Sequence, residues 1–408
     1  MCGFVGFVNL KEKLNNNSKI ILENMNNTLS RRGPDEDGYF LSDTACLAHK
    51  RLIVIDPDGG KQPMIEHKSY GDYIICYNGQ IYNTKEIRDI LIKNGFEFNG
   101  HCDTEVILKG YMHFGNDIVN HLNGIFAFAI WNTKNNELFM ARDHLGVKPL
   151  FYCLCNNTLI FASEIKALFE YPGIEKILDS QGISELLGIG PSHTPGTTIF
   201  KNIYELRPAH FGVFNEYGLK IKRYWKLKSE EHLDNLSKTR DKVRYLLKDS
   251  IERQLVSDVP LCTFLSVVLD SRIITKFAAD YYENQKLPPL DTYSIDYVDN
   301  DKNFVKSDFQ PNSDNYYINL MCRNLHTKHH NIVIDTPELA SYLYDSMIAR
   351  DMPGMADIDS SLLLFCKHVK KEKTVALTGE CADEIFGGYP WFFREDALNS
   401  GTFPWSIA

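Results

Sequence analysis

The chain has 408 residues, of which 44% are hydrophobic and 24% are charged, which is typical of a globular protein with two or three domains. Its formal net charge of −9 argues against general binding to nucleic acid or to an anionic membrane, and we expect neither partner. The sequence turns polar directly after MCGFVGFVNL, so no signal-peptide core is expected, and the longest apolar run, 125–131, is too short to span a bilayer.

The chain contains ten cysteines, none of which forms a C-x-x-C pair. Cys153 and Cys155 are the closest pair, but their spacing is wrong for a zinc knuckle. This usage indicates buried thiols in a reducing compartment. We therefore predict a cytoplasmic protein.

The first 165 residues are predicted to be rich in β-structure with helices outside the sheets. Short apolar runs separated by Gly, Asn and Asp clusters predict strands at 3–8, 46–49, 72–77, 125–131, 137–141, 150–153 and 159–162. Two helices are predicted between these strands, one over 84–93 and one that follows Asp103 and ends near Gly115.

From residue 238 onward the hydrophobic pattern changes. One face of a helix is marked by Val243, Leu246, Leu247, Ile251 and Leu255. Strands and helices then alternate, with strands expected at 261–265, 292–297, 331–334 and 374–377. This alternation predicts a doubly wound parallel sheet, whose ligands bind at the carboxyl ends of the strands, where 266–272 and 378–384 lie.

Cys2 directly follows the initiator methionine. Removal of Met1 would leave one residue with both a thiol nucleophile and an α-amine base, whose pKa is about 8. A cysteine at this position, taken alone, is far more often structural or incidental. The polar segments that follow it in the chain make the catalytic interpretation stronger.

These segments carry groups suited to an amino-acid amide substrate. Arg51 would clamp an α-carboxylate through two hydrogen bonds, and Asp103 would hold an α-ammonium. The Asn78 side chain and the Gly79 N–H would form an oxyanion hole. Taken singly, Asn78 and Gly79 would also suit a hairpin turn, and Arg51 and Asp103 would suit the surface.

The N-terminal half resembles the glutaminase domain of asparagine synthetase (glutamine-hydrolysing), a class II glutamine amidotransferase with an N-terminal-nucleophile fold. The resemblance covers MCGFVGF, RRGPDEDG, LAHKRLIVID, YNGQIYN, HCDTEVIL, GIFAFAIW, ARDHLGVKPLFY and FASEIKAL. It implies that Cys2 attacks the side-chain amide of glutamine. The glutamine-binding residues that it implies are Arg51, Leu52, Ile55, Asn78, Gly79, Gln80 and Asp103.

Gln80 departs from the family, which usually has a glutamate that contacts the substrate amine at this position. A neutral amide accepts the same hydrogen bond with less electrostatic attraction. We therefore expect weaker glutamine binding rather than loss of the chemistry.

The resemblance continues through DSIERQLVSDVPLCTFLSVVLDSRII, KHHNIVID and ALTGECADEIFGGYPW. It implies an αββα sandwich followed by a doubly wound parallel-sheet domain of the ATP-pyrophosphatase type, which we expect to be incomplete because relatives continue past SGTFPWSIA. We predict a glutaminase domain at 2–205, a connection at 206–237 and a truncated synthetase domain at 238–408.

The family's pyrophosphate loop reads S-G-G-L-D-S-S, whereas this chain has valines at both glycine positions, Val267 and Val268, and Arg272 in place of the last serine. A β-branched residue resists positive φ, which costs an L-residue about 1–2 kcal/mol. Each valine side chain would also stand where pyrophosphate must lie. We therefore predict that ATP binding is impaired.

Other parts of an ATP site are implied by the resemblance. The ATP contacts would be Leu265, Ser266, Asp270, Ser271, Ile295, Thr378 and Gly379. Asp270 and Asp383 would ligate Mg²⁺, and Glu380 would serve formation of an aspartyl-adenylate. Taken alone, the acids at 380, 383 and 384 would also suit a stabilised helix N-terminus. We interpret His326, His329 and His330 as structural rather than metal-binding.

Three functions remain open. The first is an ATP-dependent carbon–nitrogen ligase that makes asparagine from glutamine and aspartate, the second a glutaminase with an inactive ATP half, and the third a non-enzymatic remnant. An amidotransferase that forms phosphoribosylamine is disfavoured by the second domain. We predict retained glutamine hydrolysis with weak or absent ATP chemistry, and a possible homodimer by analogy.

Overall fold

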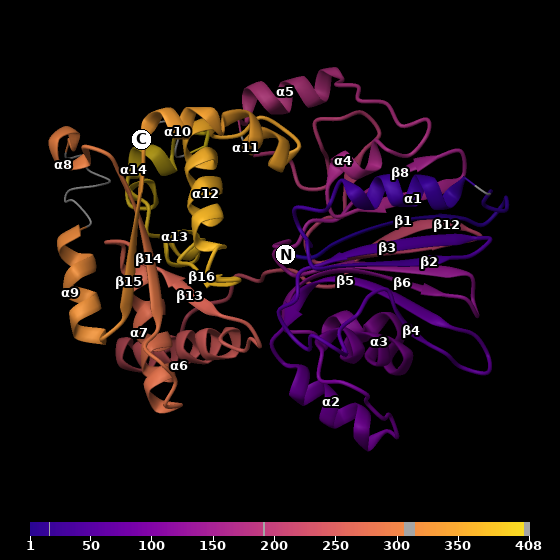
Figure 1. Cartoon of the computed structure of the whole chain (residues 1–408), viewed down its shortest axis with the longest axis horizontal. Helices are drawn as coiled ribbons and strands as arrows, with labels where there is room; N and C mark the ends of the chain where they lie inside the picture. Colours follow the sequence, from indigo (N-terminus) through magenta and orange to yellow (C-terminus); the bar gives the residue numbers. More distant parts are fainter. Residues whose placement is uncertain (16, 191, 306–314, 404–408) are drawn as a thin grey trace. The chain divides into compact units, whose positions relative to one another are not determined.

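The computed structural model describes residues 1–15, 17–190, 192–305 and 315–403, and it divides the chain into two compact units (Figure 1). Unit 1 comprises Met1–Leu233 and Leu343–Asp359, and unit 2 comprises Asp234–Tyr342 and Ser360–Ala408. The returning segment of unit 1 holds α11 (Leu343–Arg350). Within the described ranges, none of the helices has the length and apolarity that crossing a bilayer would need.

Among the described residues, unit 1 forms two antiparallel sheets of six strands each. In spatial order, the first sheet contains β10 (Tyr204–Glu205), β8 (Phe151–Cys155), β9 (Thr158–Ala162), β1 (Gly3–Asn9), β3 (Ala45–Arg51) and β2 (Glu36–Leu41). The second contains β12 (Gly218–Arg223), β11 (His210–Asn215), β7 (Glu137–Arg142), β6 (Gly124–Asn132), β5 (Tyr73–Ile81) and β4 (Met64–Glu66).

Helices cover the outer face of each sheet (Figure 1). The first sheet packs against α1 (Ser18–Asn27) and α4 (Ile165–Leu168), and the second packs against α2 (Thr84–Lys93) and α3 (Asp103–Phe114). Unit 1 also contains α5 (Ser180–Gly188). The predicted αββα sandwich is therefore confirmed.

Central strands such as β1 and β6 are almost continuously apolar because both of their faces are buried. In β1, Phe4 and Val8 lie in the core between the two sheets, whereas Val5 and Phe7 face the helix layer. Successive side chains of a strand point to opposite faces, so a strand sandwiched between two layers needs apolar residues at every position.

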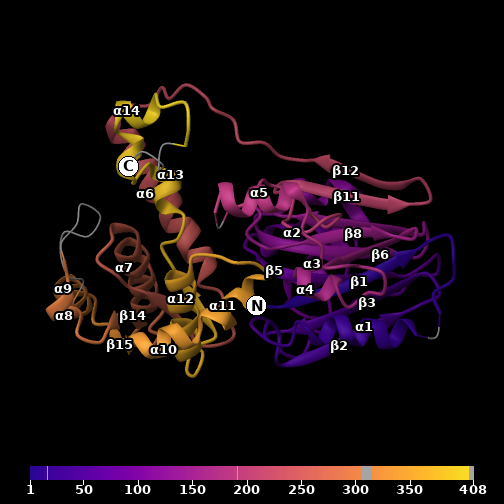
Figure 2. The same ribbon diagram turned by 90° about the horizontal axis from the view of Figure 1, so that it is seen from above.

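The predicted connection at 206–237 is partly a sheet. Its residues 210–223 form β11 and β12, which pair with each other, and β11 also pairs with β7 (Figure 2). Phe211 and Phe214 supply apolar side chains to two of the three apolar clusters in the described part of unit 1. The first half of the predicted connection is therefore part of unit 1, and the extended segment begins only after β12.

Within the described residues, unit 2 is a parallel sheet of four strands in the order β15-β14-β13-β16. Their bounds are β13 (Leu261–Phe264), β14 (Asp291–Tyr297), β15 (Lys328–Ile334) and β16 (Val375–Leu377). The helices are α6 (Leu236–Gln254), α7 (Leu269–Asn284), α8 (Asn300–Asn303), α9 (Asn315–Leu325), α10 (Thr336–Ser341), α12 (Ala356–Val369), α13 (Ala382–Phe386) and α14 (Glu395–Leu398).

Helices pack on both faces of this sheet, which confirms the predicted doubly wound arrangement. Ile251 of α6 and Ala278 of α7 pack on the face that carries Leu261. Phe365 of α12 packs on the opposite face, against Cys262. The strand order reverses between β13 and β16, and the carboxyl ends at such a switch point are where open α/β sheets bind ligands.

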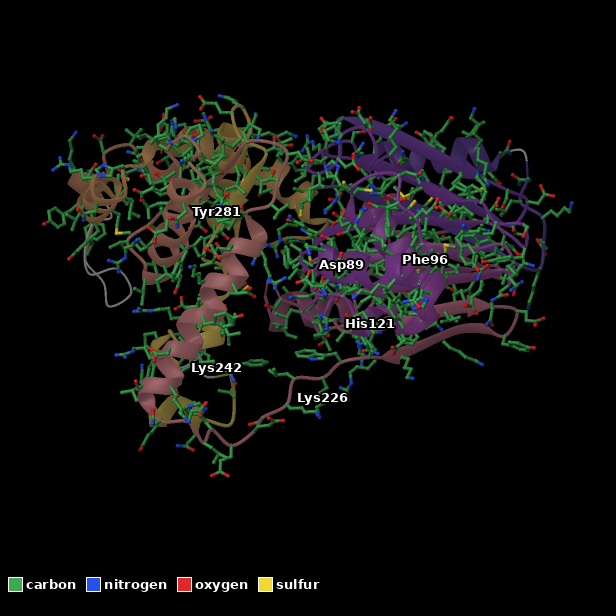
Figure 3. The ribbon with its side chains drawn as sticks, turned by 90° about the horizontal axis from the view of Figure 1, so that it is seen from below. Asp89, Phe96, His121, Lys226, Lys242 and Tyr281 are labelled. Carbon is green, nitrogen blue, oxygen red and sulfur yellow. The ribbon has the colours of Figure 1, made fainter. Side chains whose placement is uncertain are left out.

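The apolar face predicted for 243–255 is only partly covered. Ile251 and Leu255 are buried in unit 2, whereas Leu246 is 52% exposed. Lys242, which is also exposed, lies in the N-terminal half of α6 and is labelled in Figure 3.

Candidate active site

Cys2 lies immediately before β1, two residues from Phe4, which faces the space between the two sheets of unit 1. Its Sγ atom accepts a hydrogen bond from the Leu52 N–H at 3.4 Å and lies 3.5 Å from the Leu52 carbonyl oxygen. Burial raises the pKa of the thiol, and the Leu52 hydrogen bond, the N-terminal ammonium and Arg51 oppose that rise. The Leu52 backbone thus contacts the Cys2 thiol, and Arg51 acts on it electrostatically.

In this structure the α-nitrogen of Cys2 is in a peptide bond to Met1, a residue that is 55% exposed. The Met1 ammonium donates to the Arg32 carbonyl at 3.1 Å, and Arg32 Nε donates to the Cys2 carbonyl at 2.9 Å. The first peptide bond therefore lies at an exposed end of a chain whose second residue is already held in place.

Asn78 occupies the facing strand, β5. Ile74 and Cys76 of this strand belong to the core between the sheets, and Asn78 shares their face because strand side chains alternate. The residue is 1% exposed, and its Nδ2 donor has no hydrogen-bond partner among the described residues. An unpaired buried donor costs about 1–3 kcal/mol, so it calls for a ligand or another explanation.

The Gly79 N–H points toward the edge of β5 on which Asp103 lies. On either side of it, the Tyr77 N–H donates to Gln62 Oε1 at 2.6 Å and the Ile81 N–H donates to Asp103 Oδ2 at 3.1 Å. Alternate N–H groups of a strand point to the same edge, so the Gly79 N–H points there too. A Cβ atom at Gly79 would meet the Ile125 carbonyl oxygen at 2.2 Å, so this close approach requires glycine.

Asp103 is the first residue of α3 and is buried. Its Oδ2 also accepts a hydrogen bond from the Tyr77 hydroxyl at 2.7 Å. Burial raises the pKa of this carboxyl group, and a substrate ammonium beside it would favour the ionised form.

Arg51 is buried, and both of its terminal nitrogens are engaged. Nη1 contacts Glu36 Oε2 at 2.6 Å and the Pro57 carbonyl at 2.8 Å, while Nη2 donates to the Ile55 and Asp56 carbonyls. In this arrangement Arg51 orders the chain after β3 and does not present a free fork to a carboxylate. Ile55 thus meets Arg51 through its carbonyl oxygen, at 3.3 Å.

Two buried basic side chains of unit 1 were not predicted as part of the site. His49 reaches from β3 to the Tyr77 carbonyl through Nε2 at 3.0 Å, and burial lowers its pKa to about 4. Lys148 is buried, and the charge of Cys2 favours the charged form of its amine. Both residues lie in segments that carry the resemblance, but no sequence pattern predicts these surroundings.

In unit 2, the loop between β13 and α7 is closed on itself. The Ser266 N–H donates to Ser271 Oγ at 3.0 Å, the Val268 N–H donates to Ser266 Oγ at 3.3 Å, and the two hydroxyls lie 3.0 Å apart. Val268 has φ −69° and ψ 145°, and neither valine has positive φ. The expected left-handed strain at Val267 and Val268 was therefore wrong, because the loop adopts a conformation that any residue can take.

The other residues predicted to form an ATP site gather at the carboxyl ends of β13, β14 and β16. A Cβ atom at Gly379 would lie 2.9 Å from the Asp270 Cβ, so the two loops are in contact. Burial, Asp383 and Glu384 raise the pKa of Asp270, which places these carboxylates within mutual influence. The remaining members are Leu265, which follows β13, and Ile295, which lies inside β14. Thr378 follows β16, and its Oγ1 lies 3.5 Å from the Glu380 N–H.

His329 and His330, on β15, both contact polar side chains of β14. His329 contacts the Thr292 and Ser294 hydroxyls at 2.9 and 3.0 Å, and His330 pairs with Asp291 at 2.7 Å. No group of three or more His, Cys, Asp or Glu side chains in the described part of the chain is arranged to hold a metal ion.

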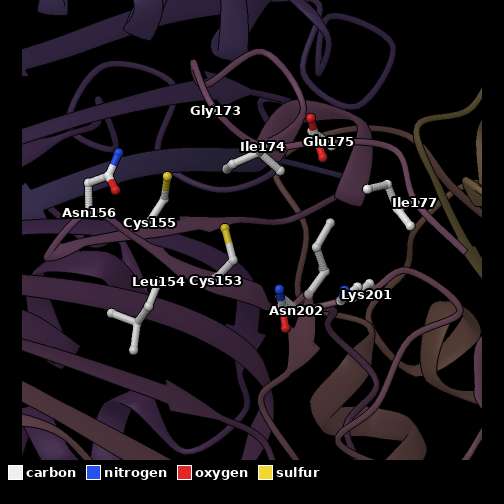
Figure 4. A pocket seen from close by; sticks show the side chains of 11 residues that line it. Cys153, Leu154, Cys155, Asn156, Gly173, Ile174, Glu175, Ile177, Lys201 and Asn202 are labelled. Carbon is white, nitrogen blue, oxygen red and sulfur yellow. The ribbon is translucent and has the colours of Figure 1, made fainter. Parts of the chain in front are cut away.

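A separate cavity of about 320 Å³ lies in unit 1, away from these residues (Figure 4). Cys153 and Cys155 line it from β8, with both thiols on the same side of the strand. None of the predicted site residues contributes to its wall.

Comparison with known proteins assigns both halves of the chain. A glutamine amidotransferase domain family matches residues 1–225, and an asparagine synthase family matches residues 242–407. A solved structure of glutamine phosphoribosylpyrophosphate amidotransferase from Bacillus subtilis covers 95% of this chain and 97% of its own at 16% identity. Its TM-score of 0.43 is too low to support a conclusion.

Among curated relatives, asparagine synthetase (glutamine-hydrolyzing) 3 from Bacillus subtilis is 50% identical over 99% of this chain and 66% of its own length. The putative asparagine synthetase (glutamine-hydrolyzing) 2 from Methanocaldococcus jannaschii is 30% identical over 95% of this chain and 76% of its own length. The chain thus spans slightly less than two thirds of the Bacillus subtilis relative. It belongs to the family of glutamine-hydrolyzing asparagine synthetases.

Proposed function

We propose that unit 1 hydrolyses glutamine to glutamate and ammonia at Cys2 after removal of Met1. The α-amine takes the thiol proton as Sγ attacks the side-chain carbonyl carbon, and it returns a proton to the nitrogen when the C–N bond breaks. Ammonia leaves, and water then cleaves the thioester to release glutamate and restore the thiol.

The unpaired Nδ2 of Asn78 carries this proposal. It is a buried donor without a partner among the described residues, on the strand that faces Cys2. Together with the Gly79 N–H it would stabilise the oxyanion of the tetrahedral intermediate, where one donor is worth about 10²–10³ in kcat.

The remaining groups would bind the charged α-ammonium and α-carboxylate of glutamine. Asp103 would hold the α-ammonium, and Arg51 would bind the α-carboxylate by exchanging Glu36 for the substrate. Leu52, Ile55 and Gln80 complete the proposed pocket, and we expect Gln80 to weaken binding relative to a glutamate.

The test is glutamate formation from glutamine alone by the mature protein, with loss of Met1 confirmed by mass spectrometry. A Cys2→Ser variant serves as control and should form no glutamate above background. Mature protein that forms no glutamate would contradict the proposal and favour a non-enzymatic role.

We propose in addition that the synthetase chemistry of unit 2 is weak or absent. Asp270 and Asp383 are suitable ligands for Mg²⁺ bound to ATP phosphates, and their mutual electrostatic influence fits such a pair. The loop does not fit a pyrophosphate, because Ser266 and Val268 direct their N–H groups to hydroxyls of the loop itself and the Val268 side chain is 49% exposed.

The substrates of a functional second half would be aspartate and ATP, with Glu380 serving the aspartyl-adenylate. Addition of ATP, Mg²⁺ and aspartate should produce no pyrophosphate and no asparagine, although glutamate forms. Formation of all three products at comparable rates would show that the valines do not block the loop. A homodimer and a cytoplasmic location remain predictions of the same kind.

A further inference from the structure

Lys148 is a buried cation that the proposed mechanism does not use. Its side chain is 7% exposed, and its backbone is fixed on both sides: its N–H donates to Asp143 Oδ2 at 3.0 Å and its carbonyl accepts from Arg142 Nε at 2.8 Å. The backbone from which the amine extends is therefore held by two side-chain hydrogen bonds.

The amine has no carboxylate partner among the residues that the structure describes, and its Nζ contacts the Met1 sulfur at 2.8 Å. Asp143 is near, but both of its oxygens accept backbone N–H groups, from Phe126 and Lys148 at Oδ2 and from Leu145 and Val147 at Oδ1. A buried ammonium without an anion is costly, so such a group points to a function.

Other charges around the nucleophile are accounted for. Arg32 pairs with Glu164 at 2.9 Å, Arg51 pairs with Glu36, and Asp103 accepts from Tyr77. Burial and, next in size, repulsion by Arg32 lower the pKa of Lys148 to about 8. Asp143 and Cys2 act in the opposite direction and favour its charged form. Of these three cations, Lys148 is the one for which the described residues supply no ion pair.

Resting on the proposed function, we propose that Lys148 is a positioning residue of the nucleophile, whose ammonium stabilises the Cys2 thiolate and disfavours protonation of the Cys2 α-amine. Departure of Met1 removes the thioether that Nζ contacts, and Met1 is the residue bonded to Cys2, so the ammonium would lie beside the new N-terminus. The ammonium lowers the pKa of the thiol and the pKa of the α-amine, since a cation stabilises a nearby anion and repels a second cation. The thiolate and the free amine of Cys2 therefore form at lower pH.

The test compares Lys148→Met with Lys148→Arg and with Lys13→Met, which removes the same charge from an exposed position. Two readouts are taken on mature protein across pH: the rate of Cys2 alkylation by iodoacetamide, followed by peptide mass spectrometry, and kcat/KM for glutamine hydrolysis. In K148M we expect the pH at which the alkylation rate rises, and the pH at which kcat/KM rises, to increase by about one unit. K148R should keep the wild-type position, and K13M should change nothing.

Unshifted alkylation and kcat/KM profiles in a folded K148M protein, checked by circular dichroism, would overturn the inference. If K148M does not fold, the test rests on K148R, whose guanidinium keeps the positive charge at every pH. A shift of its pH profiles to higher pH would contradict stabilisation of the thiolate by this charge. Alkylation needs no glutamine, so it still tests Lys148 if the wild-type protein forms no glutamate and the proposed function fails.

Discussion

At the residue scale, the candidate site depends on groups whose hydrogen-bonding capacity is unused. Asn78→Ala removes the unpaired donor, and we expect kcat for glutamine hydrolysis to fall by about 10²–10³ with little change in KM. Stability should not fall much, because no described hydrogen bond is lost. Asn26→Ala is the matched control, since Asn26 is also a buried amide without a partner among the described residues but lies on α1. Equal kinetic loss in both variants would argue against an oxyanion role.

Replacement of Asp103 should weaken glutamine binding without lowering the stability of the protein. Burial raises its pKa, so the folded protein holds this proton more tightly than the unfolded chain, and the ionised form destabilises the fold as pH rises through that pKa. Asp103→Asn should therefore keep or raise the melting temperature at pH 7. It should also raise KM for glutamine about 10–100-fold, the worth of a charge-assisted hydrogen bond. An unchanged KM would remove Asp103 from the pocket.

At the element scale, β5 requires glycine at position 79. Gly79→Ala would press a methyl group against the Ile125 carbonyl oxygen and should lower the free energy of unfolding by about 1–3 kcal/mol while abolishing glutamate formation. Gly188→Ala, on α5, is the control, because a Cβ there meets nothing and φ is not positive, so it should be neutral or stabilising in chemical denaturation. A fully stable G79A protein would mean that β5 can move away from β6.

The loop before α7 is the second element that decides activity. Its closed hydrogen bonds need no positive φ, so replacing Val267 and Val268 by glycine should cost only about 0.5–1 kcal/mol for each residue. The double variant removes the exposed Val268 side chain and frees the backbone to turn toward a ligand. We expect ATP to bind the variant at least tenfold more tightly than the wild type, measured by titration calorimetry with Mg²⁺. Unchanged affinity would place the defect elsewhere in unit 2.

At the scale of the whole molecule, the two units should act independently. Glutamate formation by unit 1 should be the same within about twofold with and without ATP, Mg²⁺ and aspartate, because the closed loop leaves unit 2 without a nucleotide-dependent state. The measurement is the initial rate of glutamate release under both conditions. A strong stimulation by ATP would show that unit 2 binds nucleotide and that the two units are coupled.

The sequence by itself determined the fold class of each half, the central strands of the sheets and the segments that carry the family pattern, because hydrophobic periodicity and motif spacing are local properties. The tertiary structure decided which distant groups meet: Lys148 with the Met1 sulfur, His49 with the Tyr77 carbonyl, and Arg51 with Glu36. It also decided that the Asn78 amide donor has no partner among the described residues and that 210–223 forms two strands. It also replaced the expected strain at Val267 and Val268 with a relaxed, self-bonded loop. The physical reason is that side-chain partners and loop conformation depend on how sheets pack in three dimensions, which no one-dimensional spacing encodes.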